Sequence, residues 1–222
     1  MEDNEKFSVD TEQLKNETKD TVNQVKDTIK GVDLKKDTVE TTNFLKEMFV
    51  NPFETIRKVA NDEDNILKKA LIIMILFIAS GVICKIISLT KYGKYSSIGN
   101  NLLGIVASFL NPIFFIVVPA IIVLIFNTKN KKSLITIIST LIIANIPVVV
   151  TYVIDIIEVL VSGISIITGP ISTALSALAI VFTYFGMKEL FNEDTEKFFK
   201  KFAIIKLVSA FILVILSRVG IY

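Results

Sequence analysis

Hydrophobic and polar positions divide the chain into two parts of opposite character. Residues 1–66 are mostly polar, whereas residues 67–222 consist of long apolar runs separated by short charged clusters. A membrane-spanning helix needs about 20 mostly apolar residues. The segments that meet this requirement lie at about 70–89, 102–126, 134–154, 164–187 and 202–222. The pattern predicts an all-α, polytopic membrane helix bundle with five transmembrane helices in residues 67–222.

The fourth apolar segment contains an internal break, because Gly169 and Pro170 interrupt the run. Proline ends or kinks a helix, since it lacks a backbone N–H and clashes with the preceding turn. We expect residues 156–169 to form an interfacial or re-entrant helix and the following part to form most of the span. The alternative is a re-entrant pair that does not cross the membrane.

Lys and Arg near the ends of the spans indicate the orientation of the bundle. The N-terminal flank, the second loop and the fourth loop contain 11 of these basic residues, whereas the first loop, the third loop and the C-terminal end contain 3. Basic residues near span ends are enriched on the cytoplasmic side. The counts predict a cytoplasmic N-terminus and an external C-terminus.

Residues 1–43 are rich in Lys, Asp, Glu and Thr and predict a polar, low-complexity cytoplasmic tail that is partly helical or disordered. An apolar seam with helical spacing, which is too short for a stable coiled coil, consists of Val22, Val25, Ile29 and Val32. The alternative to a solvated tether is a docking helix for a membrane or cytoplasmic protein partner. Adhesion to an anionic membrane is disfavoured, because residues 10–50 contain nine acids and seven bases.

Residues 44–66 have the features of an amphipathic juxtamembrane segment. Asn51 is a suitable N-cap, Pro52 suits the first helical position, and Glu54 suits the third. The apolar residues that would share one face of this helix are Phe53, Ile56 and Ala60. We expect the helix to lie at the cytoplasmic membrane surface, and the alternative is a linker helix packed on the bundle.

Several spans contain residues that can kink helices or hydrogen-bond within the bundle. Pro112 and Pro119 fall in the second span and Pro147 in the third, and each removes a backbone hydrogen bond. Asn111 and Asn145 precede such kinks and can form hydrogen bonds across helices. We favour a packing role for these residues over a hinge or substrate site at broken helices.

The composition excludes several kinds of chemistry. The 222 residues include no histidine and a single cysteine, Cys84, so the sequence cannot supply a histidine-based zinc site, a disulfide framework or a Ser-His or Cys-His catalytic unit. A Gly-rich phosphate loop and a basic, aromatic surface for nucleic acid are also missing from the pattern. We therefore expect a protein that is not an enzyme, with no catalytic residues, no metal, no cofactor and no nucleic-acid partner, surrounded by the lipid bilayer.

Asp155 and Glu158 are the only acids between Asp64 and Glu189, and they share a helix face because they are three residues apart. We expect them just past the third span on the outer side. A coupling site for protons or cations lies near the bilayer midplane, so this pair is the least favoured site. It would become a transport site if the third span slid or residues 156–168 folded back.

The segment Phe49-Val-Asn-Pro52-Phe-Glu54-Thr-Ile56 before the first span resembles the bacterial branch of the Yip family, membrane proteins named for binding Ypt/Rab GTPases. The positions of Pro112, Pro119 and Pro147 and the lysine-rich loop before the last span add to the likeness, which covers residues 44–222. The resemblance implies a five-helix bundle with a cytosolic N-terminus in the cytoplasmic membrane of a bacterium.

Two features of the family are missing from the sequence. The Asp-Leu-Tyr-Gly-Pro segment of the eukaryotic members is not found, so the Rab-binding role is not carried over. The cysteine pairs of the N-terminal zinc ribbon in many bacterial relatives are missing too. We expect a scaffold or membrane-organising subunit, and the alternative is a transporter or permease subunit that forms a pathway as a homo-oligomer.

Overall fold

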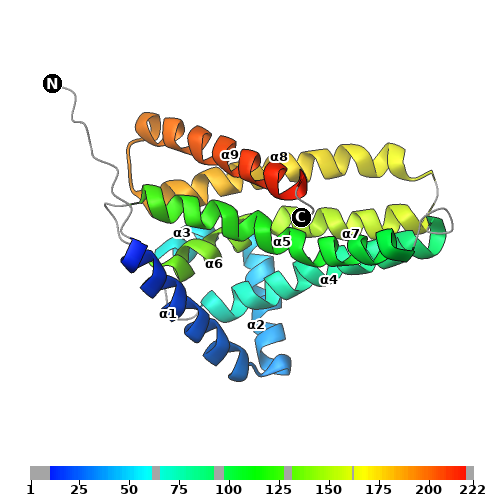
Figure 1. Ribbon diagram of the computed structural model, residues 1–222, viewed down its shortest axis with the longest axis horizontal. Coiled ribbons are helices and arrows are strands. Elements are labelled where there is room, and N and C mark those ends of the chain that lie inside the picture. Colours follow the sequence, from blue (N-terminus) through cyan, green and yellow to red (C-terminus); the bar gives the residue numbers. More distant parts are fainter. Residues whose placement is uncertain (1–10, 62–65, 93–97, 128–131, 162, 219–222) are drawn as a thin grey trace.

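The protein is all-helical over the residues that the computed structural model describes, which are 11–61, 66–92, 98–127, 132–161 and 163–218. Its helices are α1 (Thr11–Lys30), α2 (Leu34–Val50), α3 (Pro52–Asn61), α4 (Ile66–Tyr92), α5 (Ile98–Phe126), α6 (Leu134–Ala144), α7 (Ile146–Leu160), α8 (Ser165–Phe191) and α9 (Thr195–Arg218). Figure 1 shows the long helices side by side in an elongated bundle, with α1, α2, α3 and α6 toward one end. The predicted all-α bundle is confirmed.

Among the described residues, three helices, α4, α5 and α8, are long and apolar enough to cross a membrane, and α6 with α7 makes a fourth candidate if that bent pair is one span. The segment predicted as the fifth span lies in α9, which is not among these candidates. Its first half carries Lys197, Lys200, Lys201 and Lys206, and its predicted end, 219–222, lies outside the described residues. A fifth span and the orientation of the bundle therefore stay predictions.

The third apolar segment is broken near Pro147. Helix α6 ends at Ala144, α7 begins at Ile146, and the two helices are bent by 44°. Pro147 thus occupies the first turn of α7, where a backbone N–H has no partner within the helix and its loss costs little. Helix α7 continues to Leu160, beyond the predicted end of the span at residue 154.

The predicted break at Gly169 and Pro170 is wrong. Helix α8 runs without interruption from Ser165 to Phe191, and residues 156–160 belong to α7. Pro170 is exposed and is only the sixth residue of α8, so it removes one hydrogen bond near the helix start. The separate interfacial or re-entrant helix expected at 156–169 is not formed.

The most tightly packed part of the bundle lies where α3, α6 and α8 meet. Helix α6 is buried on almost every side, including Ile137 and Leu141. A Cβ atom placed on Gly186 of α8 would lie 2.9 Å from Thr140 Cγ2 of α6 and 3.2 Å from Ile56 Cγ2 of α3. Glycine therefore sets how closely these three helices approach one another.

Candidate functional site

Helices α1, α2 and α3 form a layer against the bundle, which we call the N-terminal layer (residues 11–61). Helix α2 packs on α3 and α4 through buried residues spaced four, three and four positions apart, namely Asp37, Thr41, Phe44 and Met48. This spacing is that of a single helix face. The tail boundary predicted between residues 43 and 44 therefore falls inside a continuous, packed helix.

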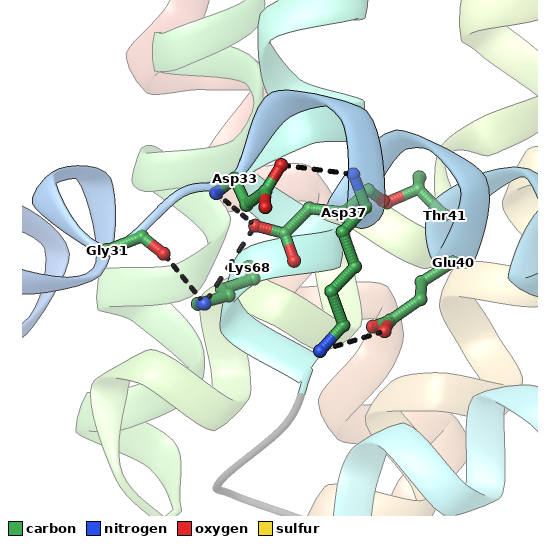
Figure 2. Close-up of polar contacts among 7 residues, drawn as sticks. Gly31, Asp33, Asp37, Glu40, Thr41 and Lys68 are labelled. Atoms are coloured by element: carbon green, nitrogen blue, oxygen red, sulfur yellow. Dashed lines mark hydrogen bonds and ion pairs between the residues drawn. The ribbon is translucent and has the colours of Figure 1, made fainter.

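A polar contact joins the N-terminal layer to the first turn of α4, as Figure 2 shows. The Lys68 ammonium donates a hydrogen bond to the Gly31 carbonyl at 2.9 Å and lies 3.8 Å from the Asp37 carboxylate. The Asp37 side chain is only 8% exposed. A buried carboxylate is costly without a partner, so this Lys68–Asp37 contact holds the α1–α2 junction in place.

The same carboxylate also caps α2. Asp37 Oδ2 accepts a hydrogen bond from the Asp33 backbone N–H at 2.8 Å, and Asp33 Oδ1 accepts one from the Lys36 N–H at 3.2 Å. These bonds satisfy backbone donors that the first turn of a helix leaves free. Sequence reasoning missed Asp37 and Lys68, although the spacing of Asp37 from Phe44 and Met48 was a signal for a packed face.

The apolar seam predicted from the sequence faces the bundle only in part, and its last member, Val32, lies beyond the end of α1. Val22 and Ile29 are 60% and 56% exposed, and the partly buried side chains include Thr21, Val25 and Thr28. Helical spacing places the four lysines of α1 in one sector beside Val22 and Ile29. We call this surface the lysine stripe, and its members are Lys15, Lys19, Lys26, Lys30, Val22 and Ile29.

Asn51 separates α2 from α3 and makes a sharp elbow, residues 49–53. The Asn51 N–H donates to the Glu47 carbonyl at 2.8 Å, and the Asn51 carbonyl accepts from the Thr55 N–H at 3.0 Å. Helix α3 begins at Pro52, as predicted from the sequence. Glu54 lies in its first turn, 3.6 Å from the Lys58 ammonium, which places an acid near the positive helix end.

The apolar face of α3 packs on α6 and α8 rather than facing a membrane surface. Ile56, Val59 and Ala60 are at most 1% exposed. The Phe53 ring contacts two rings of α8 edge to face, Phe182 at 5.8 Å and Phe185 at 4.9 Å between centroids. Of the two arrangements expected for this helix, the structure has the one packed on the bundle.

Ion pairs surround the elbow on its charged side. The Arg57 guanidinium lies 3.3 Å from Glu189 of α8, and the Lys58 ammonium lies 2.9 Å from Glu47 of α2. The hydrogen bond from Lys58 to Glu47 raises the pKa of this ammonium above its ordinary value. An open groove beside these pairs is lined by residues that include Val50, Pro52, Phe53, Glu54, Arg57 and Asn61.

The residues predicted to kink the spans or to hydrogen-bond within the bundle lie at buried or partly buried positions. Pro112 and Pro119 lie on the buried face of α5, which continues through both prolines as one helix. Asn111, beside the first of them, is partly buried. Buried Asn145 donates a hydrogen bond from Nδ2 to the Leu141 carbonyl at 2.7 Å. This bond satisfies a carbonyl in the last turn of α6, at the break before α7.

Asp155 and Glu158 lie in the last turns of α7, at the opposite end of the bundle from α3 (Figure 1), and both are partly buried. Glu158 Oε2 accepts a hydrogen bond from the Thr168 hydroxyl of α8 at 2.8 Å. The Lys91 ammonium of α4 donates to the Val159 carbonyl at 2.6 Å. The structure thus places both acids in helix α7 rather than in a loop. The hydrogen bond between Glu158 and Thr168 joins α7 to α8.

Within the described part of the chain, no group of three or more His, Cys, Asp and Glu side chains could hold a metal ion. A comparison with protein-family models matches residues 46–217 to the Yip1 domain. The match begins inside α2 and includes the elbow and every helix from α3 to α9. Comparisons with curated proteins and with solved structures gave no match.

Proposed function

Because this chain belongs to the Yip1 family of membrane proteins, we propose that it is a non-enzymatic scaffold or membrane-organising subunit of a bacterial cytoplasmic membrane. The apolar helices α4, α5 and α8 support a multi-pass arrangement, and α9 would supply a fifth span. The distribution of Lys and Arg supports a cytoplasmic N-terminal layer and an external C-terminus. A sequence without histidine supports the non-enzymatic role.

One observation carries the scaffold role, namely that the N-terminal layer is folded on the bundle and presents the lysine stripe outward. Lysines that flank exposed apolar side chains fit a protein partner with an acidic, partly apolar surface. Lys15, Lys19 and Lys26 are exposed, and Val22 and Ile29 beside them are more than half exposed. The partner is a membrane or cytoplasmic protein that reaches this side of the bundle.

Photo-crosslinking in cells tests this role. A photoreactive amino acid at Val22 or Ile29 should give a discrete protein adduct, whereas the same residue at Asp20, which is exposed on the other flank of α1, should not. Reversing charge at Lys19 and Lys26 should abolish the adduct while the amount of inserted protein stays constant. Equal adducts at all three positions, or adducts insensitive to charge reversal, would refute the scaffold role.

A second candidate function is a transporter or permease subunit that forms a pathway as a homo-oligomer. It is supported by the partial burial of Asp155 and Glu158 between helices, since acids within a membrane bundle often bind ions or protons. Their position at one end of α7, away from the Asn145 break, favours the scaffold over this alternative.

A further inference from the structure

The elbow between α2 and α3 exposes three large apolar side chains. Phe49, Val50 and Phe53 are 62%, 75% and 46% exposed. Charged residues begin immediately on either side, at Glu47 and Glu54. An apolar apex between two charged flanks is unusual for a water-facing turn, which normally contains polar residues.

The contacts of α3 show which way the elbow points. Phe53 packs on Phe182 and Phe185, and four residues later Arg57 lies 5.8 Å from the Phe185 ring centroid and pairs with Glu189. Helix α3 therefore runs in the same direction as α8. Its first residues point along α8 toward the middle of that helix, and its last residues point toward the charged end of α8.

The position of Phe53 along α8 gives its depth. Its two ring partners, Phe185 and Phe182, precede Lys188 by three and six residues, so they lie about 4.5 and 9 Å inside the level of that charge at 1.5 Å per residue. Helix α8 is long and apolar enough to cross a membrane. An amphipathic helix at a membrane interface buries its apolar face by about 5–10 Å, so the elbow reaches acyl-chain depth beside α8.

The surface around the elbow is continuous with the lipid-facing surface of α8. One turn further along the same face of α8, Leu178 and Val181 are 37% and 48% exposed. Two cations close to the elbow are paired, Arg57 with Glu189 and Lys58 with Glu47. These neutralised cations offer little attraction to an anionic headgroup or an acidic protein, whereas exposed apolar side chains fit hydrocarbon.

We propose that residues 49–53 form a wedge whose apolar side chains insert among the lipid acyl chains of the leaflet at the Lys188 end of α8. In this arrangement α2 lies across the bundle (Figure 1), the chain turns at Asn51 and Pro52, and α3 runs along α8 toward its charged end. The wedge displaces lipid from one leaflet only. It differs from the surface helix expected from the sequence, because the inserted residues lie at the apex and not on the buried face of α3.

Tryptophan fluorescence tests the wedge, and the unmodified chain adds no tryptophan emission because it contains no tryptophan. Val50→Trp and Phe49→Trp introduce single reporters at exposed positions, so no buried contact is lost. Matched controls are Ile180→Trp on the exposed face of α8 and Val22→Trp on α1, which replace side chains that are 55% and 60% exposed. Each full-length variant is reconstituted in phosphatidylcholine vesicles with or without brominated acyl chains.

The wedge predicts that Val50→Trp and Phe49→Trp emit at short wavelength and lose intensity with brominated lipid, as Ile180→Trp does. Bromine near the headgroup end of the acyl chain should quench the elbow more than bromine near its methyl end. Val22→Trp should instead be quenched by iodide in the water. Long-wavelength emission and iodide quenching at both elbow positions would overturn the proposal and leave the elbow to a protein partner.

Discussion

The substitution Gly186→Ala tests the close approach of α3, α6 and α8. The new methyl group would lie 2.9 Å from Thr140 Cγ2 and 3.2 Å from Ile56 Cγ2, distances that require the neighbouring atoms to move. Such overpacking costs about 1–3 kcal/mol. The higher helix propensity of alanine recovers at most about 1 kcal/mol. We expect the folded bundle to lose about 1–2 kcal/mol of stability.

A second glycine of α8 provides the matched control. A Cβ atom on Gly169 meets no atom within 4 Å, so Gly169→Ala adds the same methyl group to the same helix without a clash. This variant should be as stable as the unmodified protein, or more stable by up to about 1 kcal/mol. The two substitutions therefore differ in the sign of their effect.

A further variant identifies the atom responsible. Thr140→Ser removes Cγ2 and keeps the hydroxyl, which donates to the Thr136 carbonyl at 2.7 Å. In a double-mutant cycle the cost of Gly186→Ala should fall in the Thr140→Ser background, and contacting residues typically couple by about 0.5–3 kcal/mol. Thermal unfolding in mild detergent measures all four proteins, with about 2–4 °C expected per kcal/mol. Equal melting temperatures for the Gly186 and Gly169 variants would refute this account of the helix crossing.

Three other outcomes are expected. Lys68→Met should weaken the docking of α1 and α2 on the bundle by about 1–3 kcal/mol, because it leaves the Asp37 carboxylate without its cation. Amide hydrogen exchange that becomes faster only in α1 and α2 would show this effect. Asp155→Asn with Glu158→Gln should leave melting and ion flux in vesicles nearly unchanged, and a well-folded double mutant that abolishes a measured flux would establish the transporter alternative. In a cysteine-free background, an impermeant thiol reagent should label Gly99→Cys but not Glu196→Cys in intact cells, and the reverse pattern would overturn the proposed orientation.

The sequence predicts the helices whose signals are local. The start of α3 at Pro52 follows from its cap residues, and the break before Pro147 follows from a missing backbone donor. The same reasoning failed at Pro170, because α8 continues through this proline, as α5 continues through Pro112 and Pro119. The start of α8 depends on where α7 ends, at Leu160, and no local sequence signal marks that end.

The N-terminal layer could be predicted only in part. A search for apolar periodicity selects Val22 and Ile29, which the structure leaves exposed, and overlooks Asp37, which is buried. Burial of Asp37 depends on Lys68, a residue of another helix, so it is a tertiary property. The apolar face of α3 was visible in the sequence, but whether protein or membrane would cover it depended on how closely Gly186 lets α3 approach α8.

The packing of α3 has a consequence for biosynthesis. Helix α3 ends at Asn61, yet the two helices that cover its apolar face are α6 and α8, and α8 ends at Phe191. About 130 residues must therefore be synthesised after α3 before its docking surface is complete. At about 5–20 residues per second this interval is on the order of ten seconds. During that time the nascent chain carries Ile56 and Val59 without their final neighbours, so the apolar face of α3 stays uncovered until α8 has been synthesised.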